Sequence, residues 1–247
     1  MTTRRITHRL LLALLLFSGT LRAENFQLMT ENFPPLNMSS NGAAYARNDR
    51  VSGFATDIIR KVFKKTGHDV KFTLSRQWDD AYGKALTKQG YGVYSTLRSR
   101  ERESKFLWVG PLYSEDWVLL APTDSKISIF DLNEAKKYQV GSYVFDGITD
   151  YLIQSGVDIL PAQNDAVNAV KLKSNTIDLW ASSSLTGPYV AANFKLSVKP
   201  VLTFNQSSLW LAMNIETPPK IIDDLNAALK AMHDSGEIQT IINSYNQ

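Results

Sequence analysis

The 247-residue sequence contains no cysteine. This absence excludes disulfide bonds, thiolate-bound zinc, iron–sulfur clusters and cysteine nucleophiles. It also excludes an N-terminal cysteine that could carry a lipid anchor. The length suffices for one large domain or two smaller lobes, which must be held together by ordinary hydrophobic cores.

Motifs that bind nucleotides or activate a nucleophile are also missing. The sequence has no G-x-G-x-x-G, no G-x-x-x-x-G-K and no G-x-S-x-G. Its histidines, His8, His68 and His233, are too scattered to indicate a zinc site or a Ser-His-Asp triad. We therefore expect no catalytic residue, no metal and no cofactor, and a protein that is not an enzyme.

Only one long apolar run occurs, and it lies at the N-terminus. Residues 10–17 are apolar, follow Arg4, Arg5 and Arg9, and are succeeded by Leu21-Arg22-Ala23. This pattern predicts a cleavable signal peptide over residues 1–23. An uncleaved membrane anchor is the alternative, but the run is shorter than the about 20 residues that a spanning helix needs.

The excess of basic over acidic residues comes from this leader. The full sequence has 27 basic and 24 acidic residues, whereas the part after residue 23 has 23 basic and 24 acidic residues. A nucleic-acid-binding surface normally shows a strong basic patch. We therefore expect no nucleic-acid partner.

Short strand patterns alternate with helical patterns along the rest of the chain, which indicates an α/β fold. The expected strands cover residues 26–30, 70–74, 91–96, 117–121, 139–142, 177–181 and 207–214. The expected helices cover residues 54–63, 78–86, 146–154 and 163–173, with a long helix between 219 and 236 and a short one at the C-terminus. Residues 37–52 read as a polar, exposed loop.

One stretch, residues 91–113, carries the residue types of a carboxylate-binding site. A predicted strand leads there into a turn rich in hydroxyl and guanidinium groups: Ser95, Thr96, Arg98, Ser99 and Arg102. An arginine fork binds a carboxylate through two hydrogen bonds, and hydroxyl groups can donate to its remaining lone pairs. The same composition also fits a solvated basic loop balanced by Glu101 and Glu103.

Several short motifs in this order resemble the bacterial solute-binding proteins of family 3, the periplasmic receptors of polar amino-acid ABC importers. The matching segments span most of the chain: Thr30-Glu31-Asn32-Phe33-Pro34-Pro35, Gly53-Phe54 with Asp57-Ile58, Trp78, Ser99-Arg100-Glu101-Arg102, Trp108-Val109-Gly110-Pro111 and Val140-Gly141. Each motif is weak alone, and their order and spacing carry the resemblance.

The resemblance implies a two-lobe periplasmic-binding-protein fold of type II, with a ligand cleft between lobes joined by two crossing strands. Lobe 1 would comprise residues 24–115 and 205–247, and lobe 2 residues 116–204. Ligand binding would close the lobes like a hinge. The implied protein is a periplasmic monomer that presents its ligand to an ABC permease in the inner membrane.

The resemblance also assigns roles to residues of the first lobe. Arg102 takes the place of the arginine that binds the ligand carboxylate, and Ser99 supports it. Phe33 would cover the ligand, Trp78 would form a further wall, and Glu31 would make a polar contact. Phe33 and Trp78 fit an ordinary core equally well, and Glu31 could simply pair with a nearby basic residue.

The second lobe departs from the family pattern. Where many amino-acid-binding members have Gly-Thr, this chain has Val144-Phe145, flanked by Tyr143 and Asp146 as candidate contacts. Ser183 stands where those members have an aspartate for the ligand ammonium. A neutral hydroxyl lacks the charge-assisted bond of a carboxylate, worth about 1.5–3 kcal/mol. Asp146 or Glu31 could supply the anion instead.

The sequence thus favours a binding protein that captures a small polar solute, an amino acid or a related carboxylate, and delivers it to an ABC importer. One alternative is an exported dehydratase-like enzyme on the same fold, with Glu31 or Asp146 as the acid. Another is a sensor whose ligand-bound form acts on a membrane receptor.

Overall fold

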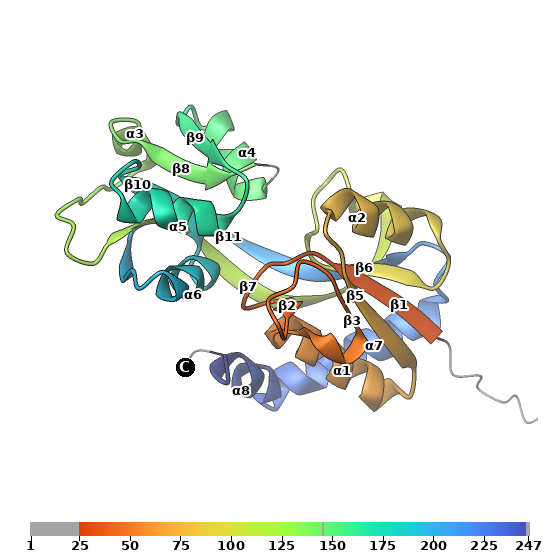
Figure 1. Ribbon diagram of the computed structural model, residues 1–247. Helices are drawn as coiled ribbons and strands as arrows, with labels where there is room; N and C mark the ends of the chain where they lie inside the picture. The colour runs from red at the N-terminus through yellow and green to blue at the C-terminus, as the bar shows by residue number, and fades with distance from the viewer. Residues whose placement is uncertain (1–24, 145, 246–247) are drawn as a thin grey trace, which may run out of the picture.

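The computed structural model describes residues 25–144 and 146–245. These residues form an α/β structure around a nine-stranded sheet of order β3-β5-β1-β6-β11-β7-β10-β8-β9 (Figure 1). The predicted signal peptide and Phe145 lie outside the described residues. None of the helices within 25–144 and 146–245 is long and apolar enough to cross a bilayer.

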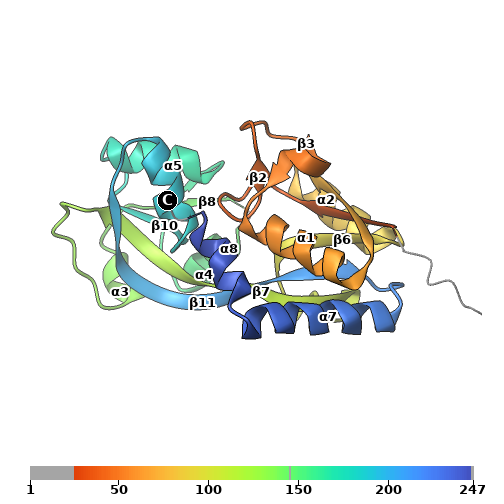
Figure 2. The ribbon, with the colours of Figure 1, turned by 90° about the horizontal axis from the view of Figure 1, so that it is seen from below.

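One half of the sheet is parallel and surrounds β1. Strand β1 (Asn25–Thr30) lies between β5 (Asp69–Leu74) and β6 (Tyr91–Leu97). Helices α1 (Phe54–Thr66), α2 (Trp78–Thr87), α7 (Pro219–Asp234) and α8 (Glu237–Asn243) complete this part, and α7 packs on α1 and on β7 (Figure 2). Buried apolar residues of α1, α7, α8 and the strands form one core, which we call the core of lobe 1, whereas α2 packs on a smaller cluster.

The predicted stripe on α1 shows why that helix forms here. Ile58, Ile59, Val62 and Phe63 recur at helical spacing, and each is at most 2% exposed. Gly67 then ends the helix with φ of 74°, a conformation that glycine adopts without steric cost.

Two long antiparallel strands connect the two halves of the molecule. Strands β7 (Phe106–Pro122) and β11 (Val198–Asn214) pair along nearly their whole length, with register shifts in β11 near residues 201, 204 and 210. Gly110 is needed because a Cβ atom there would come within 2.6 Å of Trp210. The sequence predicted only the second part of β7 and of β11. The Gly110-Pro111 pair interrupts the strand pattern of β7, and the largely polar residues 203–206 interrupt that of β11.

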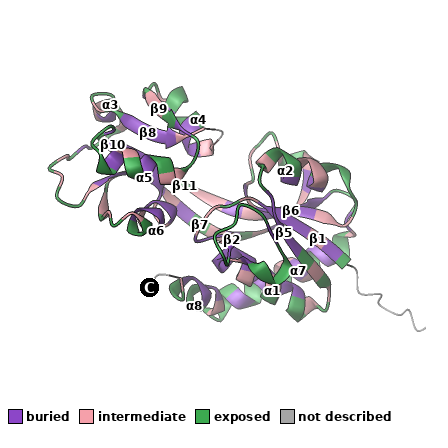
Figure 3. Ribbon diagram, in the orientation of Figure 1, coloured by how far each residue is buried: buried purple, intermediate pink, exposed green. Residues whose placement is uncertain are grey.

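The other half of the sheet contains β8 (Val140–Tyr143), β9 (Ile159–Ala162) and β10 (Leu179–Ser183). Helices α3 (Leu132–Ala135), α4 (Gly147–Gln154), α5 (Asp165–Lys173) and α6 (Thr186–Asn193) pack around these strands. In Figure 3, β8 and β10 are mostly buried, whereas α5 and α6 carry exposed stretches. The apolar residues between 117 and 204 form two further clusters, which we call the core of lobe 2.

The remaining short elements lie in or near the predicted loop of residues 37–52. They are β2 (Met38–Ser39), β3 (Ala46–Arg47), η1 (Asn48–Arg50) and β4 (Val51–Ser52), while η2 (Glu103–Lys105) precedes β7. The prediction that this loop is exposed was wrong for its anchor points, because Asn37, Ser39, Ala46 and Val51 are buried. The sequence also missed β9 and α6.

Candidate functional site

A cavity of about 460 Å³ lies between the two lobes. The ends of β1 and β6, the loop of residues 98–102 and α2 line it from lobe 1, and β7, β8 and α4 line it from the other side. Its size falls within the about 300–1,000 Å³ typical of small-molecule sites. The predicted contacts that line it are Glu31, Phe33, Trp78, Thr96, Ser99, Arg102, Tyr143 and Asp146.

Two arginines, Arg100 and Arg102, line the lobe 1 wall, and Arg102 is the one held in place by neighbouring side chains. Its Nη1 donates a 2.8 Å hydrogen bond to Thr96 Oγ1, and its guanidinium lies 5.7 Å from the ring centre of Trp78 and 5.3 Å from that of Tyr82. Within the described residues it forms no ion pair with an acidic side chain. The rest of its fork is therefore available to an anionic ligand.

Hydroxyl-bearing residues line the cavity together with Arg102. Thr96 is 2% exposed, and Ser95 and Ser99 also line the cavity. Ser99 shapes the turn, since its carbonyl accepts a 3.0 Å hydrogen bond from the Arg102 backbone N–H. The side chain of Ser95 is held by a short hydrogen bond to Asn37.

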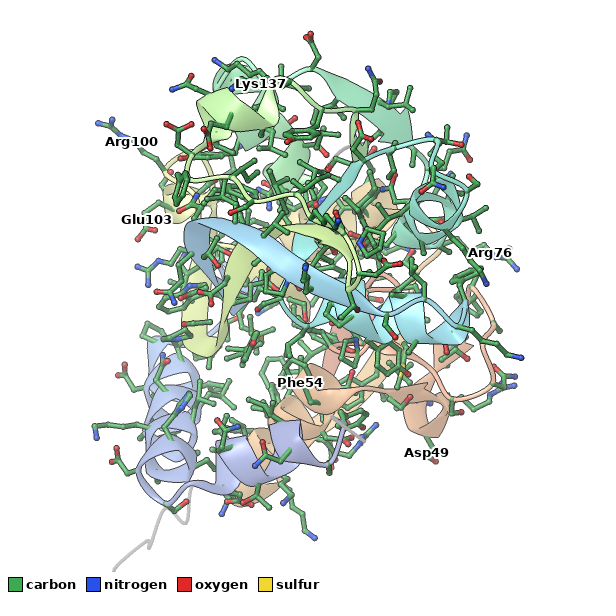
Figure 4. The ribbon with its side chains drawn as sticks, turned by 90° about the vertical axis from the view of Figure 1, so that its left-hand side faces the viewer. Asp49, Phe54, Arg76, Arg100, Glu103 and Lys137 are labelled. Carbon is green, nitrogen blue, oxygen red and sulfur yellow. The ribbon has the colours of Figure 1, made fainter. Side chains whose placement is uncertain are left out.

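Arg98, also predicted to contact the ligand, does not line the cavity. Its Nε and Nη2 donate to Glu103 at 2.8 and 2.6 Å, and its guanidinium stacks 4.7 Å from the ring centre of Trp210. The alternative of a balanced basic loop thus describes Arg98, whereas Arg102 forms no ion pair within the described residues. Figure 4 shows Arg100 pointing away from the molecule at the edge where Glu103 lies.

The two predicted aromatic walls serve the cavity and the core together. Phe33 and Trp78 are half-buried and line the cavity. Phe33 also packs against the lobe 1 core, and Trp78 packs against a smaller cluster that includes Trp108 and Ala81. The two interpretations offered by the sequence are therefore compatible.

The cavity also has an acidic end, to which both lobes contribute. Glu31, Glu115 and Asp146 all line it, and Tyr143 Oη donates a 3.4 Å hydrogen bond to Glu31 Oε1 across the cleft. Burial raises the pKa of Glu31, and burial together with the charges of Asp165, Glu115 and Glu31 raises the pKa of Asp146 well above its ordinary value.

Glu115 is the residue that the sequence analysis missed. It lies on β7, is 4% exposed, and its Oε2 atom has no hydrogen-bond partner among the described residues. Burial raises its pKa to about 7. A signal was available, because Glu115 alternates with Tyr113 and Trp117 on one face of the strand, where a carboxylate interrupts an aromatic row.

Asp165 lies behind this acidic end and does not line the cavity. Its Oδ1 accepts a 2.8 Å hydrogen bond from Trp180 Nε1, and burial raises its pKa to about 6. Ser183 is also outside the cavity lining: it is completely buried, and its Oγ accepts a hydrogen bond from the Thr186 backbone N–H at 3.0 Å. The predicted contact Phe145 lies outside the described residues.

Comparison with solved structures shows the same fold over most of the chain. A histidine kinase sensor domain with similarity to periplasmic binding proteins has a TM-score of 0.75 at 16% identity, covering 91% of this chain and 96% of that one. An ancestral arginine-binding protein bound to arginine has a TM-score of 0.72 at 21% identity, covering 91% and 98%. An ancestral amino-acid-binding protein, AncCDT-1, a precursor of cyclohexadienyl dehydratase, has a TM-score of 0.70 at 18% identity, covering 90% and 95%.

These likenesses, at low identity, establish the fold. They confirm the predicted α/β architecture of two lobes, joined by two crossing strands, with a cleft between them. None of the curated protein sequences matches this chain significantly. The family model of the bacterial extracellular solute-binding proteins, family 3, matches residues 28–247. The order of motifs along the chain, the two-lobe fold and this match agree: the protein belongs to family 3 of the bacterial extracellular solute-binding proteins.

Proposed function

We propose that this protein captures a small polar solute with a carboxylate group and presents it to an ABC importer. The observation that carries the proposal is Arg102, whose guanidinium faces the interlobe cavity, is oriented by Thr96 and has no acidic partner within the described residues. Amino acids and related carboxylates fit this site. The structural likeness to an arginine-binding protein supports the choice of amino acids as first probes.

The division of the cores supports hinge closure of two lobes. The core of lobe 1 draws on residues 26–112 and 209–242, whereas the core of lobe 2 draws on residues 117–204. This division supports the proposed lobe boundaries of 24–115 with 205–247, and 116–204. Only β7 and β11 need to bend when the cavity closes around a ligand.

Export as a periplasmic monomer completes the proposal. The leader of residues 1–23 is removed during export, so the intact mass of protein purified from the periplasm corresponds to a chain beginning at residue 24. Size-exclusion chromatography with light scattering gives the mass of a monomer. Detection of the full-length chain in the membrane fraction would instead support an uncleaved anchor.

Ligand binding is tested by calorimetric titration of the mature protein with amino acids, their deaminated analogues and dicarboxylates. Arg102→Ala abolishes binding of the ligand found in this way, without changing the circular dichroism spectrum, because the side chain lies at the cavity wall. Arg50→Ala is the matched control, since Arg50 is exposed and its side chain makes no hydrogen bond within the described part of the chain. Undiminished binding by Arg102→Ala would place the carboxylate site elsewhere.

A dehydratase-like enzyme is the second candidate, and one observation favours it. Glu115 is a buried carboxyl group that lines the same cavity as Arg102, and its pKa of about 7 suits a general acid. Incubation of the wild-type protein with carboxylated cyclic alcohols tests this candidate. If the wild-type protein dehydrates a substrate and Glu115→Gln does not, the protein is an enzyme. If the substrate mixture stays unchanged, the binding-protein proposal stands.

A further inference from the structure

The cavity carries more negative than positive side chains, and its acidic end is uncompensated. Glu31, Glu115 and Asp146 come from three separate elements, and Asp165 lies close behind them. None of these four carboxyl groups takes part in a salt bridge among the described residues. The two cations of the lining are Arg100, which is exposed, and Arg102, which is held by Thr96 and two aromatic rings on lobe 1.

Glu115 makes this end a site and not merely an acidic surface. The side chain is 4% exposed, its Oε2 atom has no partner, and it lines the cavity. A buried carboxyl oxygen without a partner is destabilising unless the group is neutralised or paired with a cation, and the interactions of Glu115 with Ser183 and Trp117 offset its burial only in part. Neutralisation takes the form of a raised pKa. A positively charged ligand would supply the missing partner.

The cation that fits is organic rather than a metal ion. In the part of the chain that the structure describes, no group of three or more histidine and acidic side chains has the geometry to hold a metal. The carboxyl groups are spread over both lobes around a cavity of about 460 Å³, which is far larger than an ion. Leu97 and Trp117 add apolar wall between them, which suits the methylene groups of an ammonium- or guanidinium-bearing chain.

We infer that the solute carries a second cationic group, distal to its α-ammonium, which binds between Glu115, Asp146 and Glu31. This inference rests on the proposed function, which places the carboxylate at Arg102. One ammonium compensates one negative charge, whereas three carboxyl groups line this end of the cavity and a fourth lies behind them. The ligand class is therefore that of the basic amino acids, which have a net positive charge.

L-Arginine and L-citrulline form the test pair, because they have nearly the same shape and differ in the charge of the distal group. Calorimetric titration at pH 8 gives a dissociation constant for each. We expect arginine to bind at least 10-fold more tightly than citrulline. L-Lysine and L-norleucine form a second pair. If the site fits an ammonium group better than a guanidinium group, lysine should bind more tightly than norleucine in the same titration.

Glu115→Gln assigns the preference to the acidic end. It should reduce the ratio of citrulline to arginine dissociation constants to below about 3. Asp146→Asn is the second variant and should lower the same ratio. Glu101→Gln is the matched control, because Glu101 is at the cavity rim, exposed and paired with Lys105, and it should keep the wild-type ratio.

The outcomes separate this inference from the function on which it rests. Equal or tighter binding of citrulline and norleucine would overturn the distal cation and leave carboxylate capture standing. Tight binding of Ca²⁺ or Mg²⁺ that competes with arginine would also overturn it. If Arg102→Ala binds every probe as well as the wild type does, the proposed function itself fails.

Discussion

The two ends of the interlobe cavity treat their charged groups in opposite ways. At the lobe 1 end, Arg102 is already oriented by Thr96 and stacked near Trp78 and Tyr82. At the other end, Glu115 is buried with an unpartnered oxygen. We therefore expect the first end to be preorganised for a ligand and the second to gain its partner from the ligand. Charge alone therefore does not identify a binding group; what matters is whether its partners are already present.

The same lesson separates two arginines of one loop. Arg98 has both a carboxylate partner in Glu103 and a tryptophan face, whereas Arg102 has a hydroxyl partner and no acid. Their residue types and neighbours in the sequence are alike. Only the structure shows which of them is already paired.

The largest effect should come from replacing each of these two arginines by alanine in turn. Arg102→Ala removes the carboxylate partner and should weaken binding by about 100-fold or more, which is about 3 kcal/mol. Arg98→Ala should change affinity less than about threefold, because its guanidinium does not face the cavity. Titration of both variants with the same ligand measures the difference, and a larger loss for Arg98→Ala would reverse our assignment.

Burial of the ionised Glu115 should lower the free energy of unfolding. The pKa of Glu115 is about 7 in the folded protein against an ordinary 4.5, so the folded state holds this proton more tightly than the unfolded chain does. The free energy of unfolding should therefore fall as the pH rises from about 4.5 to about 7. Glu115→Gln should remove much of this fall and raise stability at pH 8 by about 2–3 kcal/mol. Urea unfolding at pH 5 and pH 8 provides the comparison.

That prediction has a clear contrary outcome. If Glu115→Gln destabilises the protein at pH 8, the carboxylate must have a partner that stabilises its ionised form. Asp116, Asp146 and Asp165 surround Glu115 and also ionise, so the double variant Glu115→Gln/Asp146→Asn should flatten the profile further.

Affinity for a cationic ligand should have the opposite pH dependence from stability. The carboxyl group of Glu115 must lose its proton to pair with a cation, and so arginine binding should tighten about 10-fold between pH 6 and pH 8 for one released proton. Titration in two buffers of different ionisation enthalpy counts that proton directly. Affinity that is constant over this range would argue against Glu115 as the partner.

The smallest effect is expected at Ser183, on the strand next to the acidic end. Ser183 is buried and accepts a hydrogen bond from the Thr186 backbone N–H where α6 begins. Ser183→Ala should lower the free energy of unfolding by about 1 kcal/mol and leave ligand affinity unchanged. A loss of affinity above fivefold would return Ser183 to the ligand, as the sequence first suggested.

Local patterns predicted most of the fold. The α1 stripe, the strands β1, β5 and β6, and the helix beginning at Pro219 follow from the spacing of apolar residues and from glycine and proline signals, which act within a few residues. Strands β7 and β11 extend beyond their predicted segments, because each continues through polar or Gly-Pro residues by pairing with the other. Such pairing is a property of the sheet and not of either segment.

The residues of the candidate site also differ in how far the sequence could predict them. Arg102 and its hydroxyl neighbours are close in sequence, so a short motif indicated them. Glu115, Glu31 and Asp146 meet only because three distant segments converge on the cavity. Their effect on one another is electrostatic, and a list of residues does not contain it.

The crossing strands have a consequence for how the chain folds during its synthesis. The core of lobe 2 is built from one continuous stretch, residues 117–204, with little help from elsewhere. The core of lobe 1 needs Leu211, Met213 and Leu225, which are made last. The inserted lobe can thus assemble while the lobe that flanks it is still incomplete. The first half of the chain, although translated earliest, must wait for the C-terminus before it has a finished interior.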